Sequence, residues 1–199
     1  MLDIVVKGGP VMIPLIFCSI LAVAVGLERL WYMYSSGTDT EEFMDEVRAA
    51  LSNRRFYEAE EMARREKGPV PAVVAAGISQ YERGKEEIRR RMEEAGRDEI
   101  YKMQRGLVVL DAVVTIAPLL GLLGTVTGII KSFRILSAMQ GLAEPSMLSS
   151  GIAEALIATA TGLIIAIPVM ALYHYLSSQV EKRVAEMNKT SGELLEILG

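Results

Sequence analysis

Seven polar side chains lie at the edge of, or within, two apolar stretches in the second half of the sequence. They are two carboxylates and five threonine hydroxyls, at Asp111, Thr115, Thr125, Thr127, Glu154, Thr159 and Thr161. A carboxylate in a membrane-spanning stretch is costly because lipid cannot solvate its charge, so such a residue usually faces water or other protein and indicates a functional site. The pattern therefore predicts more than a membrane anchor: these groups face water, an ion or another chain.

The two apolar stretches, 112–130 and 155–180, contain no charged residue. Each is long enough to cross a hydrocarbon core about 30 Å thick, which requires roughly 20 apolar residues. The segment 140–146 between them combines glycine, proline and polar residues, as turns do. The stretch 106–180 is therefore predicted to form a helical hairpin in a membrane.

Small residues recur in both predicted helices, at Gly121, Gly124, Gly128 and Gly162, together with Gly151, Ala155 and Ala158. They let two helix backbones approach closely and favour helix association in lipid. Pro118 and Pro168 each lack a backbone N–H, which leaves a carbonyl for another group to satisfy. We expect these glycines and prolines to shape the packing of the hairpin.

Residues equally far from the turn lie at similar depth in an antiparallel hairpin. Thr125 and Thr159 are equally far from Leu142, so their hydroxyls are predicted to form one level inside the membrane. By the same count, Lys131 lies close to the level of Glu154. Thr159 and Glu154 point roughly 140° apart around their helix, at 100° per residue. One helix with two polar faces suits a ring of copies that has a lumen on one side and neighbours on the other.

A third uncharged run, 11–27, precedes the aromatic cluster 30–34, which is typical of a membrane interface. Its flank is scarcely basic, so we interpret it as an uncleaved span rather than a signal peptide. The segment 35–105 is charged and shows helical periodicity, with a break at 68–71. Basic residues beside the span ends, such as Arg29, Lys102 and Lys182, place this loop and the tail in the cytoplasm.

Several classes of function are excluded by the composition. The net charge of −4, without a basic stripe, argues against nucleic-acid binding. Cys18 is the single cysteine, so an internal disulfide is impossible, and the sequence lacks the cysteine–histidine spacing of a metal site. It also has no nucleophile motif or phosphate-binding loop. We therefore expect neither an enzyme nor a cofactor-binding protein.

Two strings within the hairpin resemble a known family. The segments APLLGLLGTVTGI (117–129) and GIAEALIATATGLIIAIP (151–168), together with three spans and a large loop after the first, are similar to the ExbB/TolQ family, distant relatives of MotA. The resemblance implies a subunit of a bacterial inner-membrane ring, usually a pentamer. Such a ring encloses a single-span partner of the ExbD/TolR kind, with a TonB/TolA-like protein outside it. The proton-motive force then drives mechanical work at the cell envelope.

The resemblance also implies roles for individual residues. Thr125 and Thr159 correspond to pore-lining threonines, and Glu154 to the membrane-embedded glutamate, which together make the proton pathway. The proton-carrying aspartate belongs to the partner, so protons are the coupling ion and no cofactor is expected. Thr127 and Lys131 depart from the family pattern.

Other interpretations of the same residues stay open. The threonine hydroxyls can donate to carbonyls of their own helices, and Glu154 can form a structural ion pair with Lys131. Two other functions also fit the sequence: an oligomeric ion channel that works without a partner, and a membrane scaffold that does not conduct.

The predicted fold is an all-α integral membrane protein with three transmembrane helices and a large helical cytoplasmic loop. Its parts are, in order, a periplasmic N-terminus (1–10), a first transmembrane helix (11–34), the cytoplasmic loop (35–105), a second transmembrane helix (106–136), a periplasmic turn (137–148), a third transmembrane helix (149–178) and a cytoplasmic helical tail (179–199).

Overall fold

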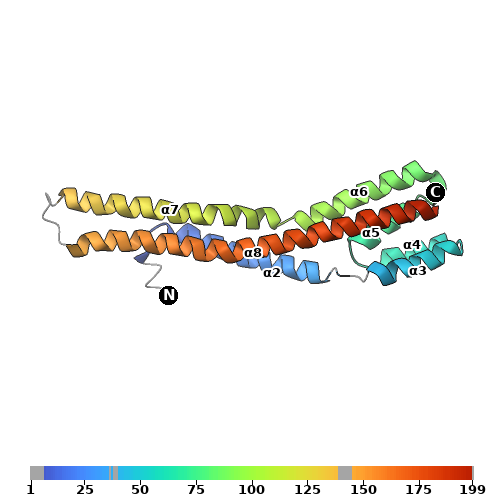
Figure 1. Cartoon of the computed structure of the whole chain (residues 1–199), viewed down its shortest axis with the longest axis horizontal. Helices are drawn as coiled ribbons and strands as arrows, with labels where there is room; N and C mark the ends of the chain where they lie inside the picture. The colour runs from blue at the N-terminus through green and yellow to red at the C-terminus, as the bar shows by residue number, and fades with distance from the viewer. Residues whose placement is uncertain (1–6, 36, 38–39, 139–144, 199) are drawn as a thin grey trace. The chain divides into compact units, whose positions relative to one another are not determined.

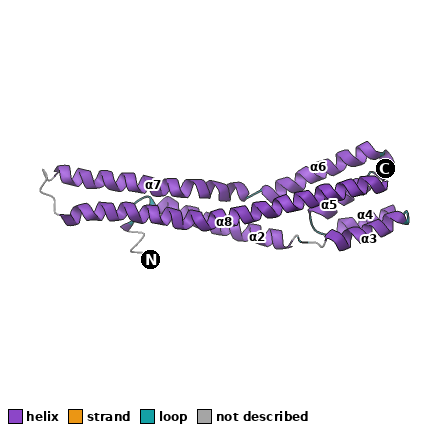
Figure 2. Ribbon diagram, viewed as in Figure 1, coloured by secondary structure: helices purple, strands orange, loops and turns teal. Residues whose placement is uncertain are grey.

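The structure, a computed structural model, describes residues 7–35, 37, 40–138 and 145–198 (Figure 1). Within these ranges the regular elements are all helices (Figure 2). They are α2 (Met12–Ser35), α3 (Thr40–Ser52), α4 (Phe56–Arg65), α5 (Pro69–Ile78), η1 (Tyr81–Arg83), α6 (Lys85–Gln104), α7 (Leu107–Ala138) and α8 (Pro145–Leu198). The predicted N-terminus 1–10 and turn 137–148 lie partly outside the described residues.

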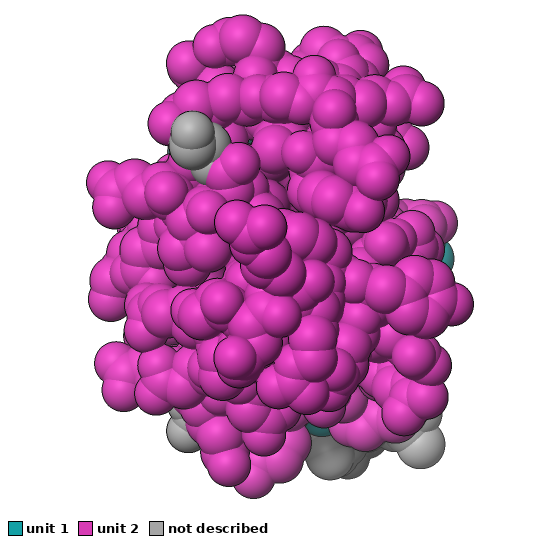
Figure 3. Space-filling view, turned by 90° about the vertical axis from the view of Figure 1, so that its right-hand side faces the viewer, with its two compact units in different colours: residues 1–28, 106–174 teal, residues 29–105, 175–199 magenta. Residues whose placement is uncertain are grey.

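Among the described residues, three helical segments are long and apolar enough to cross a membrane: Met12–Ser35, Lys85–Ala138, which runs through α6 and α7, and Ser149–Leu198. The all-α class and the three long apolar helices expected from the sequence are confirmed. The chain divides into two compact units, coloured separately in Figure 3. Unit 1 comprises residues 1–28 and 106–174, and unit 2 comprises residues 29–105 and 175–199.

Unit 1 contains α7, the first part of α8 and most of α2. In lipid every backbone N–H and C=O group needs a hydrogen-bond partner within the protein. A helix supplies these bonds within one segment, so these apolar runs are helical. The helices α7 and α8 lie side by side (Figure 1). The helix α2 buries Leu15 and Ala22 and leaves other large apolar side chains exposed, among them Ile13, Phe17, Ile20, Val23 and Leu27.

Unit 2 is built around α5, the short apolar helix between α4 and α6. Eight of its ten residues are buried, including Val73, Val74 and Ile78. Ile88 and Met92 of α6 and Leu194 of α8 are buried in the same unit. The sequence indicated a break at 68–71. In the structure the helix α5 begins at Pro69, so the break is the boundary between α4 and α5. Proline is tolerated in the first turn of a helix because the N–H it lacks would have no acceptor there.

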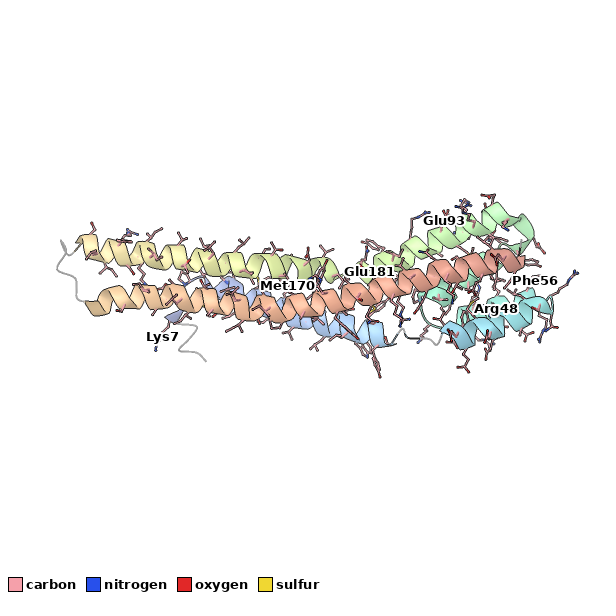
Figure 4. The ribbon with its side chains drawn as sticks, viewed as in Figure 1. Lys7, Arg48, Phe56, Glu93, Met170 and Glu181 are labelled. Atoms are coloured by element: carbon pink, nitrogen blue, oxygen red, sulfur yellow. The ribbon has the colours of Figure 1, made fainter. Side chains whose placement is uncertain are left out.

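Charged side chains cover the surface of unit 2. Most of their ion pairs join residues three or four apart on one helix, as in α6, where Arg90 donates to Glu87 (2.5 Å) and lowers the pKa of that carboxyl. Exposed pairs of this kind contribute little to stability. Arg48, labelled in Figure 4, instead joins α3 to α8 through Glu193 at 2.6 Å.

One buried cation fastens α2 to the end of α6. Arg29, a residue that is 9% exposed, donates from Nη1 to the carbonyl of Lys102 at 3.0 Å. It also lies 4.9 Å from the centre of the Tyr32 ring. A cation that binds the last carbonyls of a helix satisfies acceptors without intrahelical partners and interacts favourably with the helix dipole.

We expect Gly77→Val to destabilise unit 2. An added Cβ at Gly77 would lie 2.7 Å from Sδ of Met92 and 2.9 Å from Cδ2 of Leu194. Overpacking of this kind costs about 1–3 kcal/mol, which thermal unfolding followed by circular dichroism can measure. Gly192→Ala in α8 is the matched control, because an added Cβ there meets nothing within 4 Å. Equal unfolding temperatures for the two variants would contradict this packing.

Candidate functional site

A seam of small residues joins α7 to α8. On α7 the buried positions of this seam are Ala117, Gly121, Gly124, Gly128 and Ser132, and on α8 they are Gly151, Ala155, Ala158 and Gly162. Residues three and four apart share one face of a helix, so each set forms a continuous stripe. The four glycines predicted to shape the packing all lie in this seam.

The two backbones are in direct contact along the seam. A Cβ added at Gly162 would lie 2.6 Å from the carbonyl oxygen of Ala117. One added at Gly128 would lie 2.7 Å from the carbonyl oxygen of Gly151. Because the opposing atoms belong to backbones, they cannot rotate away as a flexible side chain would. The seam therefore fixes the register of the hairpin.

This register brings the two predicted lining threonines to one level of α7. Thr159 on α8 donates its hydroxyl across the seam to the carbonyl of Gly121, at 3.0 Å. Thr125 donates to the next carbonyl of α7, that of Leu122, at 2.6 Å. Both side chains are half-buried. The bond of Thr125 stays within its own helix, whereas the bond of Thr159 joins two helices.

The other three threonine hydroxyls singled out in the sequence bind within their own helices. Thr161 donates to the carbonyl of Ile157 at 2.8 Å, and Thr127 to that of Leu123 at 3.0 Å. Thr115 donates to the carbonyl of Asp111 at 3.1 Å, and the Asp111 side chain is exposed. Such bonds are a common way for threonine to satisfy its hydroxyl in a helix.

The predicted ion pair between Lys131 and Glu154 is present in the structure. Nζ of Lys131 on α7 lies 2.6 Å from Oε2 of Glu154 on α8. The glutamate side chain is 13% exposed and the lysine side chain 59%. On its other side, the Glu154 carboxylate lies against Gly9, where an added Cβ would overlap Oε1.

The two predicted packing prolines lie inside continuous helices. Pro118 is half-buried in α7, and Pro168 is exposed in α8. Each removes one helical N–H donor, and a span tolerates this loss where neighbouring groups satisfy the freed carbonyl.

Two contributors to this site were missed in the sequence. Ser132 packs against Gly151, and its hydroxyl donates to the carbonyl of Gly128 at 3.1 Å. It follows Gly128 by four residues on the same face, and this spacing could have identified it. Gly9 gave no comparable signal, because its contact joins segments far apart in the sequence.

Comparison with known proteins identifies the family. The model of the MotA/TolQ/ExbB proton channel family matches residues 65–189. The chain belongs to this family. It is 33% identical to ExbB-like 1 of Synechocystis sp. over 198 residues, which cover 98% of this chain and 77% of that protein.

Two further relatives carry the same family names. Over 182 residues the chain is 30% identical to the biopolymer transport protein exbB1 of Vibrio cholerae, covering 89% of this chain and 79% of that protein. Over 174 residues it is 30% identical to the Tol-Pal system protein TolQ of Pseudomonas aeruginosa. The match covers 87% of this chain and 68% of that protein. The resemblance to ExbB/TolQ is confirmed, and with its three apolar helices the chain is a multi-pass membrane protein. Members of this family are channel or stator subunits associated with transport, not known enzymes.

We expect Gly162→Val to weaken the hairpin, because the carbonyl of Ala117 occupies the space that the new side chain needs. The cost of overpacking at a rigid contact is about 1–3 kcal/mol. Thermal unfolding of the detergent-solubilised protein measures it. Ala160→Val is the matched control, since Ala160 is an exposed residue of the same helix. A loss of stability in both variants alike would show that the seam is not what holds the two helices together.

Proposed function

We propose that this chain is a ring-forming subunit of an inner-membrane motor driven by the proton-motive force. The observation that carries the proposal is the pair of hydroxyls at one level of α7, where Thr125 and Thr159 bind the neighbouring carbonyls of Leu122 and Gly121. In a member of a proton channel family, a level of hydroxyls inside the membrane suits a narrow polar path.

Several copies, five by analogy with the family, enclose the apolar helix of a single-span partner of the ExbD/TolR kind. Relatives named for biopolymer transport and for the Tol-Pal system support this class of partner. A TonB/TolA-like protein binds the outside of the ring and passes the mechanical work to the envelope. Lipid contacts the exposed apolar side chains of α2.

Protons move along a path lined by Thr125, Thr159 and Glu154 to an acid of the partner. Protonation neutralises this acid and so allows it to move through an apolar environment. The cycle rotates or shifts the partner against the ring. Each proton contributes about 2.3 kcal/mol per 100 mV of membrane potential. Protons are the only coupling ion in this scheme, and it includes no cofactor.

The distribution of basic residues supports one orientation in the bacterial inner membrane. Arg29, Lys102 and Lys182 lie near span ends on the side of the loop and tail, which we place in the cytoplasm. The N-terminus and the turn between α7 and α8 then face the periplasm.

A non-conducting scaffold is the second candidate, and one observation favours it. The hydroxyls of Thr115, Thr125, Thr127, Thr159 and Thr161 all donate to backbone carbonyls. Hydroxyls bound in this way can serve packing alone. The flux experiment below separates the two functions.

Thr159→Val is expected to abolish proton flux while leaving the fold nearly intact. Valine matches threonine in shape, and a hydrogen bond between membrane helices contributes only about 0.6 kcal/mol. Flux is measured in liposomes that contain the tagged full-length chain, alone or with the single-span protein that co-purifies from its host membranes. We expect flux only with that protein.

Thr161→Val is the matched control, because its hydroxyl binds within α8. Full flux in Thr161→Val and none in Thr159→Val would support the lined path. Flux from the chain alone would instead favour a channel that needs no partner. Absence of flux from every sample, together with normal function of the Thr159→Val variant in cells, would favour the scaffold.

A further inference from the structure

We propose that Lys131 and the turn 7–11 are positioning elements that hold Glu154 as a fixed anion. In this arrangement Glu154 acts on the proposed path only through its charge, from a neighbouring face of α8, and does not itself take up or release the transported proton. The inference concerns how one residue of the proposed pathway works. Its statement about proton transfer rests on the proposed function, whereas its statement that Lys131 and Gly9 hold Glu154 in place does not.

The face of α8 that carries Glu154 is the face that α2 and its preceding turn cover. An added Cβ at Gly8 would lie 3.2 Å from Ile157, and one at Gly26 would lie 2.7 Å from Leu172. Glu154 and Leu172 are separated by about five helical turns at 3.6 residues per turn, so they share one line along α8. The carboxylate therefore points toward the α2 side of unit 1.

Thr159 points to a different side of the same helix. It lies roughly 140° from Glu154 around α8, and its hydroxyl donates to Gly121 on α7. The threonine level and the glutamate thus occupy separate faces. A proton that follows the threonine face does not need to bind at Glu154.

Both oxygens of the Glu154 carboxylate lie against other parts of the chain. Oε2 is 2.6 Å from Nζ of Lys131, and Oε1 lies against the backbone of Gly9. Gly9 has a φ of +74° and a side chain there would overlap the carboxylate, so the turn at this point requires glycine. These contacts leave only 13% of the glutamate side chain exposed.

Such a site stabilises the Glu154 carboxylate together with the Lys131 ammonium, and it destabilises the carboxylate when the ammonium is removed. Removing Lys131 leaves the carboxylate of Glu154, whose side chain is 13% exposed, without its counter-ion, whereas replacing both residues with uncharged groups of similar size is often tolerated. Lys131 keeps its own charge near the membrane surface through its long flexible side chain.

The first test compares the wild type with Lys131→Met, Glu154→Gln and the double variant, each as the full-length chain in the complex purified from host membranes. Two quantities are measured: the midpoint of thermal unfolding and proton flux in liposomes. We expect each single change to lower both quantities and the double change to restore both. Lys131→Arg, which keeps the pair, should match the wild type.

Three results would overturn the proposal. If the double variant regains its unfolding midpoint but stays without flux, Glu154 carries the proton. If the effects of the single changes on the midpoint simply add, the two residues do not hold each other. If Glu154→Gln alone leaves both quantities unchanged, no fixed anion is required. The control pair Arg64→Met with Glu60→Gln, in the exposed bridge of α4, should show little effect.

The second test introduces Gly9→Ala into the wild type and into Glu154→Ala. The backbone strain of an alanine at positive φ is the same in both backgrounds and cancels, whereas the clash with the carboxylate exists only in the wild type. We expect a smaller fall of the unfolding midpoint in the Glu154→Ala background. Equal falls would contradict a role of the turn in holding Glu154.

The two tests also separate this inference from the proposed function. A wild-type complex without proton flux would refute the motor. The unfolding midpoints of both variant sets would still decide whether Lys131 and Gly9 hold Glu154 in place.

Discussion

The close approach of two backbones along the α7–α8 seam is the constraint on which the candidate site depends. In lipid the hydrophobic effect does not drive helices together, so association relies on packing and on interhelical hydrogen bonds. Carbonyl oxygens of Ala117 and Gly151 lie where side chains at Gly162 and Gly128 would otherwise be. This contact permits essentially one register. The same register sets Thr159 opposite Gly121 and Lys131 opposite Glu154.

The helix α8 therefore makes polar contacts on two different faces. The face of α8 with Thr159 supplies a hydroxyl to α7, and the face with Glu154 meets Lys131 and the turn before α2. In the proposed motor, this separation would keep the hydroxyl-lined path polar without placing in it a charged side chain that binds or repels the proton.

Unit 2 combines an apolar core with a charged surface. Its core is the apolar helix α5, whose Gly77 lies against Met92 and Leu194. The charged pairs of α4 and α6 are exposed and belong mostly to single helices. Arg29 of α2 donates a hydrogen bond to a carbonyl near the end of α6.

The three apolar helices, the stripes of small residues and the common level of Thr125 and Thr159 could all be predicted without a structure. Length, periodicity and distance from the turn are properties of the chain alone, so these features could be predicted. The sequence did not determine that α5 is a helix, because two prolines resemble a break until their place in the first turn is known. Two contacts became visible only in the folded chain: Gly9 encloses Glu154, and Thr159 bonds across the seam while Thr125 bonds within its own helix. Such contacts depend on the rotation of each helix about its axis, and packing sets this rotation.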